Sequence, residues 1–176
     1  VQAFIPPGGS MAYKFRAAPH GTPWHHSPAG MRWADGLRGL FIVEGPEDPW
    51  AGAYDGDAAI ALADDMEKTT ALAYYWAKES VAFASTATTN SDPDGLYYER
   101  GVTGGQAVVT APAGGRARIR LAHVGWNMRA VVKVAGHTMV VVSTDGAYCK
   151  PVRATRLTIS PGERYDVLVD TKEAGD

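Results

Sequence analysis

Short segments of β-forming residues, separated by turn residues, are the feature that most limits how this chain can fold. From residue 96 onward these turns recur about every 8–12 residues, for example at Pro161-Gly162 between residues 156–160 and 164–169. The 20 glycines and 11 prolines are scattered along the chain rather than gathered in one tract. Evenly spaced turns of this kind are typical of a sandwich or barrel, so the sequence predicts an all-β fold.

Alternating apolar and polar residues predict individual strands, because successive side chains of a strand point to opposite faces. Residues 11–16 alternate in this way, with Met11, Tyr13 and Phe15 on one face. Residues 116–121 alternate arginines with apolar residues, which predicts a strand with one face in water.

Two turn signals predict β-hairpins. Gly136-His137 lies between residues 130–135 and 138–143, and Asp145-Gly146 follows the second of these segments. On the last strand, Arg164 and Asp166 share a face and are expected to form a polar pair. Other expected elements are strands at residues 21–28, 37–44 and 58–65, a short helix or irregular excursion at 66–80 and a polar loop at 85–95.

Composition excludes several classes of partner. The formal charge of −2 offers no electrostatic attraction to nucleic acid or to an anionic membrane. No apolar run approaches the roughly 20 residues that span a bilayer, and a basic segment followed by an apolar one, which would mark a signal peptide, is missing. Cys149 is the only cysteine, so an internal disulfide is impossible. The start at Val1 suggests a processed product or a segment of a longer protein.

Three of the five histidines, His20, His25 and His26, fall within seven residues. Imidazole nitrogen is largely neutral at pH 7 and is a good copper ligand. Histidines this close together on a strand edge require a metal, a carboxylate or open solvent. His25 and His26 must point to opposite faces of a strand, because side chains repeat every second residue.

Four segments carry patterns that recur together in one group of proteins. Residues 2–15 are similar to Q-x-P-I-x-P-G-x-S-F-x-Y-x-F, and residues 21–39 are similar to G-T-x-W-Y-H-S-H…D-G-L-x-G. Residues 136–146 look like a G-H-x-M/L…D-G hairpin, and residues 158–169 look like L-x-I-x-P-G-E/Q-R-Y-D-V-L-V. In this order they resemble the multicopper oxidases, the family of laccases, ascorbate oxidases and ferroxidases.

The resemblance implies cupredoxin-like Greek-key β-sandwiches, also called plastocyanin-like domains. Residues 1–50 would be the later part of a first cupredoxin domain, 51–57 a linker, and 58–176 most of a second domain that binds no copper itself. The opening strands of the first domain would be missing, which leaves strand edges unpaired. Residues 1–50 are therefore expected to pack against the remaining cupredoxin domains of the same protein or against neighbouring chains. Family analogy places the protein outside the cell or in a lumen.

The same resemblance assigns one residue to copper. His26 matches the first histidine of the family's His-x-His pair, whose two rings address two coppers, and Pro28 stands where the second would be. His25 cannot replace that ligand from the opposite face. Arg32 stands where the family usually has glutamine, and its permanent charge would repel copper ions.

Two functions therefore remain open. The chain is either part of a copper-dependent oxidase that couples oxidation of phenols, ascorbate or metal ions to dioxygen reduction, inactive as this segment alone, or a copper-free cupredoxin scaffold that serves as a structural or interaction module. The patterns G-x-S-x-G, G-x-x-x-x-G-K-S/T, C-x-x-C and H-E-x-x-H are absent from the sequence. The remaining candidate residues, His20, His25, His123, His137, Trp24 and Trp33, are expected to have surface, turn or packing roles.

Overall fold

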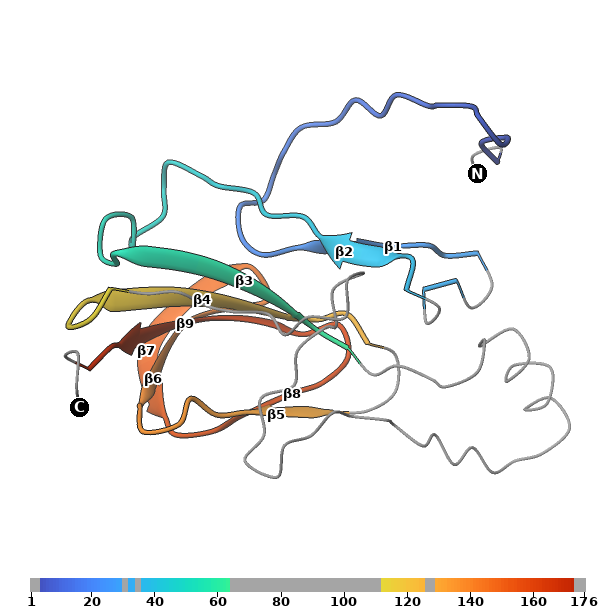
Figure 1. Cartoon of the computed structure of the whole chain (residues 1–176). Coiled ribbons are helices and arrows are strands. Elements are labelled where there is room, and N and C mark those ends of the chain that lie inside the picture. The colour runs from blue at the N-terminus through green and yellow to red at the C-terminus, as the bar shows by residue number, and fades with distance from the viewer. Residues whose placement is uncertain (1–3, 30–31, 34–35, 64–111, 126–128, 173–176) are drawn as a thin grey trace, which may run out of the picture.

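The computed structural model describes residues 4–29, 32–33, 36–63, 112–125 and 129–172 (Figure 1). Every regular element in these ranges is a β-strand, which confirms the predicted all-β class. The expected excursion at 66–80 and loop at 85–95 lie outside the described residues. The strands are β1 (Trp24–His26), β2 (Arg38–Leu40), β3 (Gly56–Leu62), β4 (Arg116–His123), β5 (Ala130–Val132), β6 (Met139–Thr144), β7 (Ala147–Ala154), β8 (Leu157–Ile159) and β9 (Arg164–Asp170).

A five-stranded sheet in the order β3-β4-β9-β6-β7 is the centre of the fold. One of its faces packs against the two-stranded sheet β5-β8, and apolar side chains from both sheets form the main core. The two-stranded ribbon β1-β2 lies on the opposite side of the large sheet (Figure 1). The large sheet is therefore covered on both faces, as strands of a layered sandwich are.

The turn at Asp145-Gly146 joins β6 and β7 as predicted, since these strands pair antiparallel on either side of it. Asp145 has φ 51° and Gly146 has φ 86°, the two positive values that a type I′ hairpin turn requires. The hairpin predicted at Gly136-His137 is wrong. β5 pairs with β8, whereas β6 pairs with β7 and β9, so this turn is a corner at which the chain changes sheets.

The prediction that residues 116–121 have one wet face is also wrong. Strand β4 lies between β3 and β9. Ile119 and Leu121 point into the main core, and the arginines on the other face are buried too, Arg118 at 0% and Arg120 at 4% exposure. Residues from the first third of the chain cover that face and supply the carboxylates that pair with the arginines.

Residues 11–16 form no strand, contrary to the prediction. Met11, Tyr13 and Phe15 are 43%, 60% and 64% exposed, so the alternation does not bury one face here. A strand also needs a neighbouring backbone to pair with, and no strand in the described ranges lies beside this segment. Alternation in sequence cannot show whether that neighbour is present.

Candidate functional site

The histidine stretch folds as a strand of an antiparallel ribbon. β1 pairs with β2 through the partners Trp24↔Leu40, His25↔Gly39 and His26↔Arg38. The ribbon continues backward to a bridge between residues 21 and 43. The two expected strands are confirmed, but both are shorter than predicted. His25 and His26 both lie within β1.

His26 is exposed at the end of β1, and two indole rings hold its imidazole. The ring centroids lie 4.7 Å from Trp24 and 4.8 Å from Trp33. Trp33 is fixed in turn, because its Nε1–H donates to the carbonyl oxygen of Val124 (2.6 Å). The Nδ1 atom of His26 lies 3.3 Å from the carbonyl oxygen of Ser27. With the Nδ1 proton donated to that carbonyl, Nε2 keeps its lone pair and can bind a metal ion.

The neighbouring histidines have other surroundings. His25 covers Gly39 on the opposite face, where an added Cβ would lie 2.6 Å from Cε1 of the imidazole. The opposite orientation of His25 and His26 is therefore as expected. His20, predicted to be a surface histidine, is instead half-buried and stacks on Tyr148, with the ring centroids 5.0 Å apart.

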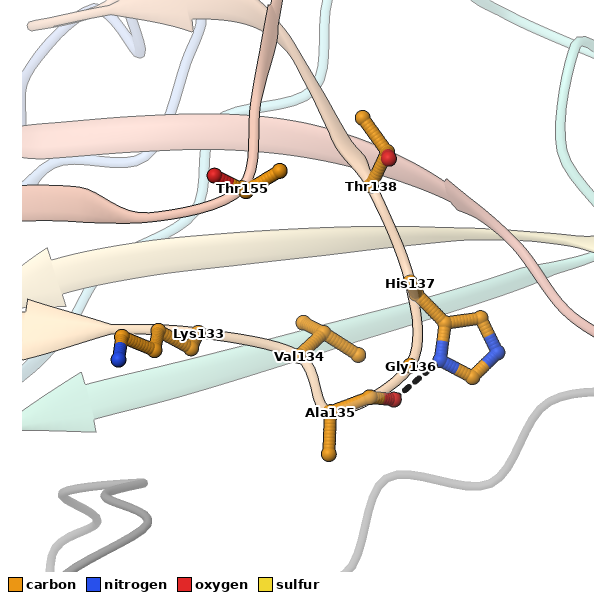
Figure 2. Close-up of a pocket in the computed structure, with 7 residues that line it drawn as sticks. All are labelled: Lys133, Val134, Ala135, Gly136, His137, Thr138 and Thr155. Carbon is orange, nitrogen blue, oxygen red and sulfur yellow. Dashed lines mark hydrogen bonds between the residues drawn. The ribbon is translucent and has the colours of Figure 1, made fainter.

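His137 and His123 have structural roles. The Nδ1 atom of His137 lies 2.6 Å from the carbonyl oxygen of Ala135 and closes the corner between β5 and β6, in line with its expected turn role. His123 is 2% exposed, and its Nδ1 accepts from the backbone N–H of Gly125 (3.1 Å). Residues 133–138 and Thr155 line an open pocket of about 500 Å³ (Figure 2). The Lys133 amine and the His137 ring lie at opposite ends of it, so its polar groups do not converge on one point (Figure 2).

Comparisons with known proteins agree on one family. The family model described as multicopper oxidase matches residues 58–176, and a second multicopper oxidase model matches residues 1–48. The chain belongs to the multicopper oxidase family. Laccase-1 of Fomitopsis schrenkii is 32% identical over 187 residues, and the oxidoreductase OpS5 of Beauveria bassiana is 29% identical over 185 residues.

These alignments cover 100% of this chain but only 32% and 31% of the two relatives. A mutant of the B. aclada laccase is similar in structure, with a TM-score of 0.76 and 28% sequence identity over 98% of this chain and 33% of that chain. The predicted cupredoxin-like sandwich is therefore confirmed. The chain spans about a third of the length of the relatives that it matches.

As a member of the multicopper oxidase family, the chain can be tested for ligands to copper. Among the residues that the structure describes, no three histidine, cysteine, aspartate or glutamate side chains gather where they could hold a metal ion. His26 fits as one nitrogen donor, and Pro28 beside it is exposed and offers no donor side chain. Arg38 is the cross-strand partner of His26 and donates to the carbonyl oxygen of Trp33 (3.0 Å). Any copper at His26 would need further ligands from outside the described residues.

A second polar site, which the sequence did not reveal, lies where the ribbon side of the molecule meets the large sheet. The guanidinium of Arg118 pairs with the carboxylates of Asp48 and Asp166, and its NH2 donates to Oδ2 of Asp166 at 2.6 Å. Arg120 pairs with Asp57 at 2.7 Å. The aromatic ring of Tyr54 lies 5.5 Å from the Arg118 guanidinium carbon. Because Arg118, Arg120 and Asp166 are buried, each of these charges needs a partner.

The carboxylate partners change the protonation equilibria of this cluster. Burial alone would lower the pKa of Arg118, but its hydrogen bonds to Asp166 and Asp48 raise that pKa above its ordinary value. Burial alone would raise the pKa of Asp48, but the hydrogen bonds from Arg118 and from the backbone N–H of Trp50 bring it below its ordinary value. The pairing of Arg118 with Asp48 therefore favours the charged form of both groups.

The expected pair between Arg164 and Asp166 is wrong. Asp166 bonds to Arg118, and Arg164 instead bonds to Asp145, with its NH1 3.1 Å from Oδ1. The sequence signal for the buried cluster was the alternation of arginines with apolar residues at 116–121, of which Arg118 and Arg120 are buried. Their carboxylate partners are distant in sequence, so the pattern could not distinguish a wet face from a buried ionic one.

Proposed function

We propose that this chain is part of a copper-dependent oxidase in which His26 supplies one copper ligand. The observation that carries the proposal is the fixed imidazole: its ring is stacked on Trp24 and Trp33, and its Nδ1 lies near the Ser27 carbonyl oxygen. This arrangement leaves Nε2 as the metal-binding nitrogen. When bound, copper supplies the one-electron chemistry that couples oxidation of a phenol, ascorbate or a metal ion to reduction of dioxygen.

The test is copper analysis of the full-length protein that contains this chain. We expect the His26→Ala variant to lose copper affinity by at least about 10–100-fold, the effect of disturbing even a residue that supports a ligand. His25→Ala is the matched control, because it removes the adjacent imidazole on the opposite face. Equal copper content in both variants and the unaltered protein would reject His26 as a ligand.

A copper-free scaffold is the second candidate, and the charge near His26 favours it. Arg38 stands opposite His26 in the ribbon. The charge of Arg38 would raise the cost of placing a divalent ion nearby. A full-length protein that folds normally and takes up no copper would support the scaffold and exclude the oxidase.

We further propose that other cupredoxin domains of the same protein cover residues 4–42. Among the residues that the structure describes, all the exposed large hydrophobic side chains except Val152 lie in this range, and they include Phe15 and Phe41, whose ring centroids are 5.7 Å apart. Several large apolar side chains exposed within one segment favour an interaction site there. In the full-length protein, the backbone amides of residues 4–16 should be protected from hydrogen exchange. Exchange at the rate of an unstructured peptide would contradict the proposal.

We also propose a division into residues 1–50, a linker at 51–57 and a second cupredoxin domain at 58–176. The two separate family matches, at 1–48 and 58–176, support this division. Limited proteolysis of the full-length protein should cut first at residues 51–55, before β3 begins, and early cuts elsewhere in the described residues would argue against the division. Extracellular or lumenal placement is proposed by family analogy, and fractionation of the native source tests it. Among the described residues, no helix is long and apolar enough to cross a membrane.

A further inference from the structure

One buried carboxylate connects the strand of His26 to the large sheet. Asp166, on β9, is 2% exposed and accepts two hydrogen bonds from different parts of the chain. Thr22 donates its hydroxyl hydrogen to Oδ1 (2.8 Å), and Arg118 donates to Oδ2 (2.6 Å). Thr22 is 1% exposed, so water does not compete for its bond. The carboxylate therefore joins the segment that leads into β1 with two strands of the central sheet.

The position of Thr22 determines where His26 can lie. Backbone hydrogen bonds run along the ribbon from Gly21 onward, including the bond from Phe41 N–H to the carbonyl oxygen of Pro23 (2.9 Å). His26 follows Thr22 by four positions along extended chain, a distance of about 13 Å. A shift of Thr22 along the sheet would thus be transmitted through the ribbon to the imidazole.

The connection between β1 and β2 makes one further directional contact, from Trp33 Nε1–H to the carbonyl oxygen of Val124 (2.6 Å), and the contacts of β1 and β2 themselves are apolar. Trp24 and Leu40 pack against Ala61, Ala122 and Val124. Apolar contact is favourable over a range of positions, whereas a buried hydrogen bond to a charged group requires a defined distance and angle. The apolar contacts hold the ribbon against the sheet, and the bond between Thr22 and Asp166 sets the position of the segment that enters β1.

We infer that Asp166 is a positioning residue for His26, acting through Thr22, while Arg118 holds the carboxylate in place. Only the effect on a bound copper ion rests on the proposed function. The geometric claim, that this carboxylate fixes β1 on the sheet, applies with or without metal.

The test uses hydrogen exchange in the metal-free full-length protein. Thr22→Val removes the hydroxyl and keeps the shape of the side chain. We expect exchange of the amides of residues 21–27 to become about 10–100-fold faster, the effect of losing a hydrogen bond to a charged group. Thr22→Ser, which keeps the hydroxyl, should restore slow exchange. Thr158→Val is the matched control, because Thr158 is exposed on β8.

The possible outcomes separate the inference from the proposed function. Faster exchange confined to the ribbon, with rescue by Thr22→Ser, supports positioning. Exchange in Thr22→Val within twofold of the control overturns it, and so does an equal increase across the whole central sheet, which indicates a general stability role. Copper titration of the same proteins, followed by electron paramagnetic resonance, should show an altered copper signal in Thr22→Val. If the unaltered protein binds no copper while the ribbon responds, the proposed function fails and the positioning role stands.

Discussion

Replacing Arg118 with methionine removes the cation at the centre of the buried cluster and keeps a side chain of similar length. Loss of one partner of a buried ion pair costs about 3–5 kcal/mol, because a buried charge is left uncompensated. Two carboxylates would be affected here, but each keeps one other donor. Asp166 retains the bond from Thr22, and Asp48 retains the bond from the Trp50 N–H. We therefore expect the free energy of opening to fall by an amount near the lower limit, about 3 kcal/mol, which is roughly a 100-fold increase in the equilibrium constant for opening.

Arg116→Met on the same strand is the matched control. The side chains of Arg116 and its partner Asp170 are 44% and 64% exposed, and an exposed ion pair contributes only about 0.2–1 kcal/mol. Hydrogen exchange of amides in the β4–β9 ladder of the full-length protein measures both opening free energies in the same region. If Arg118→Met lowers the opening free energy of the β4–β9 ladder no more than Arg116→Met does, the buried cluster does not stabilise the central sheet.

Two further predictions concern the same region. The pKa of Asp48 is lowered in the folded state, so its stabilising contribution should be complete above the ordinary carboxyl value of about 3.9 and be lost as the pH falls through the folded pKa. In Asp48→Asn, the urea concentration at the unfolding midpoint should therefore fall less steeply as the pH is lowered. Gly21→Ala should lower thermal stability by about 1–3 kcal/mol, since Gly21 has φ 136° and an added Cβ would lie 2.8 Å from Cα of Gly146. Gly52→Ala, at φ 74° in open space, should cost about 1 kcal/mol or less.

Local chemistry explains which parts of the fold the sequence predicted correctly. The turn at Asp145-Gly146 is specified by two adjacent residues that tolerate positive φ, so no knowledge of the rest of the chain was needed. Gly136-His137 carries a similar signal but joins two sheets. A turn signal identifies a change of direction, and the strand that pairs next is decided by distant residues such as those of β8.

The candidate site divides in the same way. The opposite orientation of His25 and His26 follows from strand geometry alone and agrees with the structure. The stacking of His26 on Trp33 depends on an 11-residue connection between β1 and β2 that sequence patterns do not describe. The burial of Arg118 depends on Asp48 and Asp166, which lie 70 and 48 residues away along the chain.

The salt bridge between Asp48 and Arg118 has a consequence for where this protein can be divided. A cut in the sequence between residues 50 and 58 separates the two family matches, but it would also remove a partner from a guanidinium with 0% exposure. A shortened protein that begins at Ala58 would present a cationic sheet face to solvent, with Asp57 removed from Arg120 as well. A chimaeric protein that combines cupredoxin domains of two relatives would therefore fold only if it kept these aspartates together with the arginines that they neutralise.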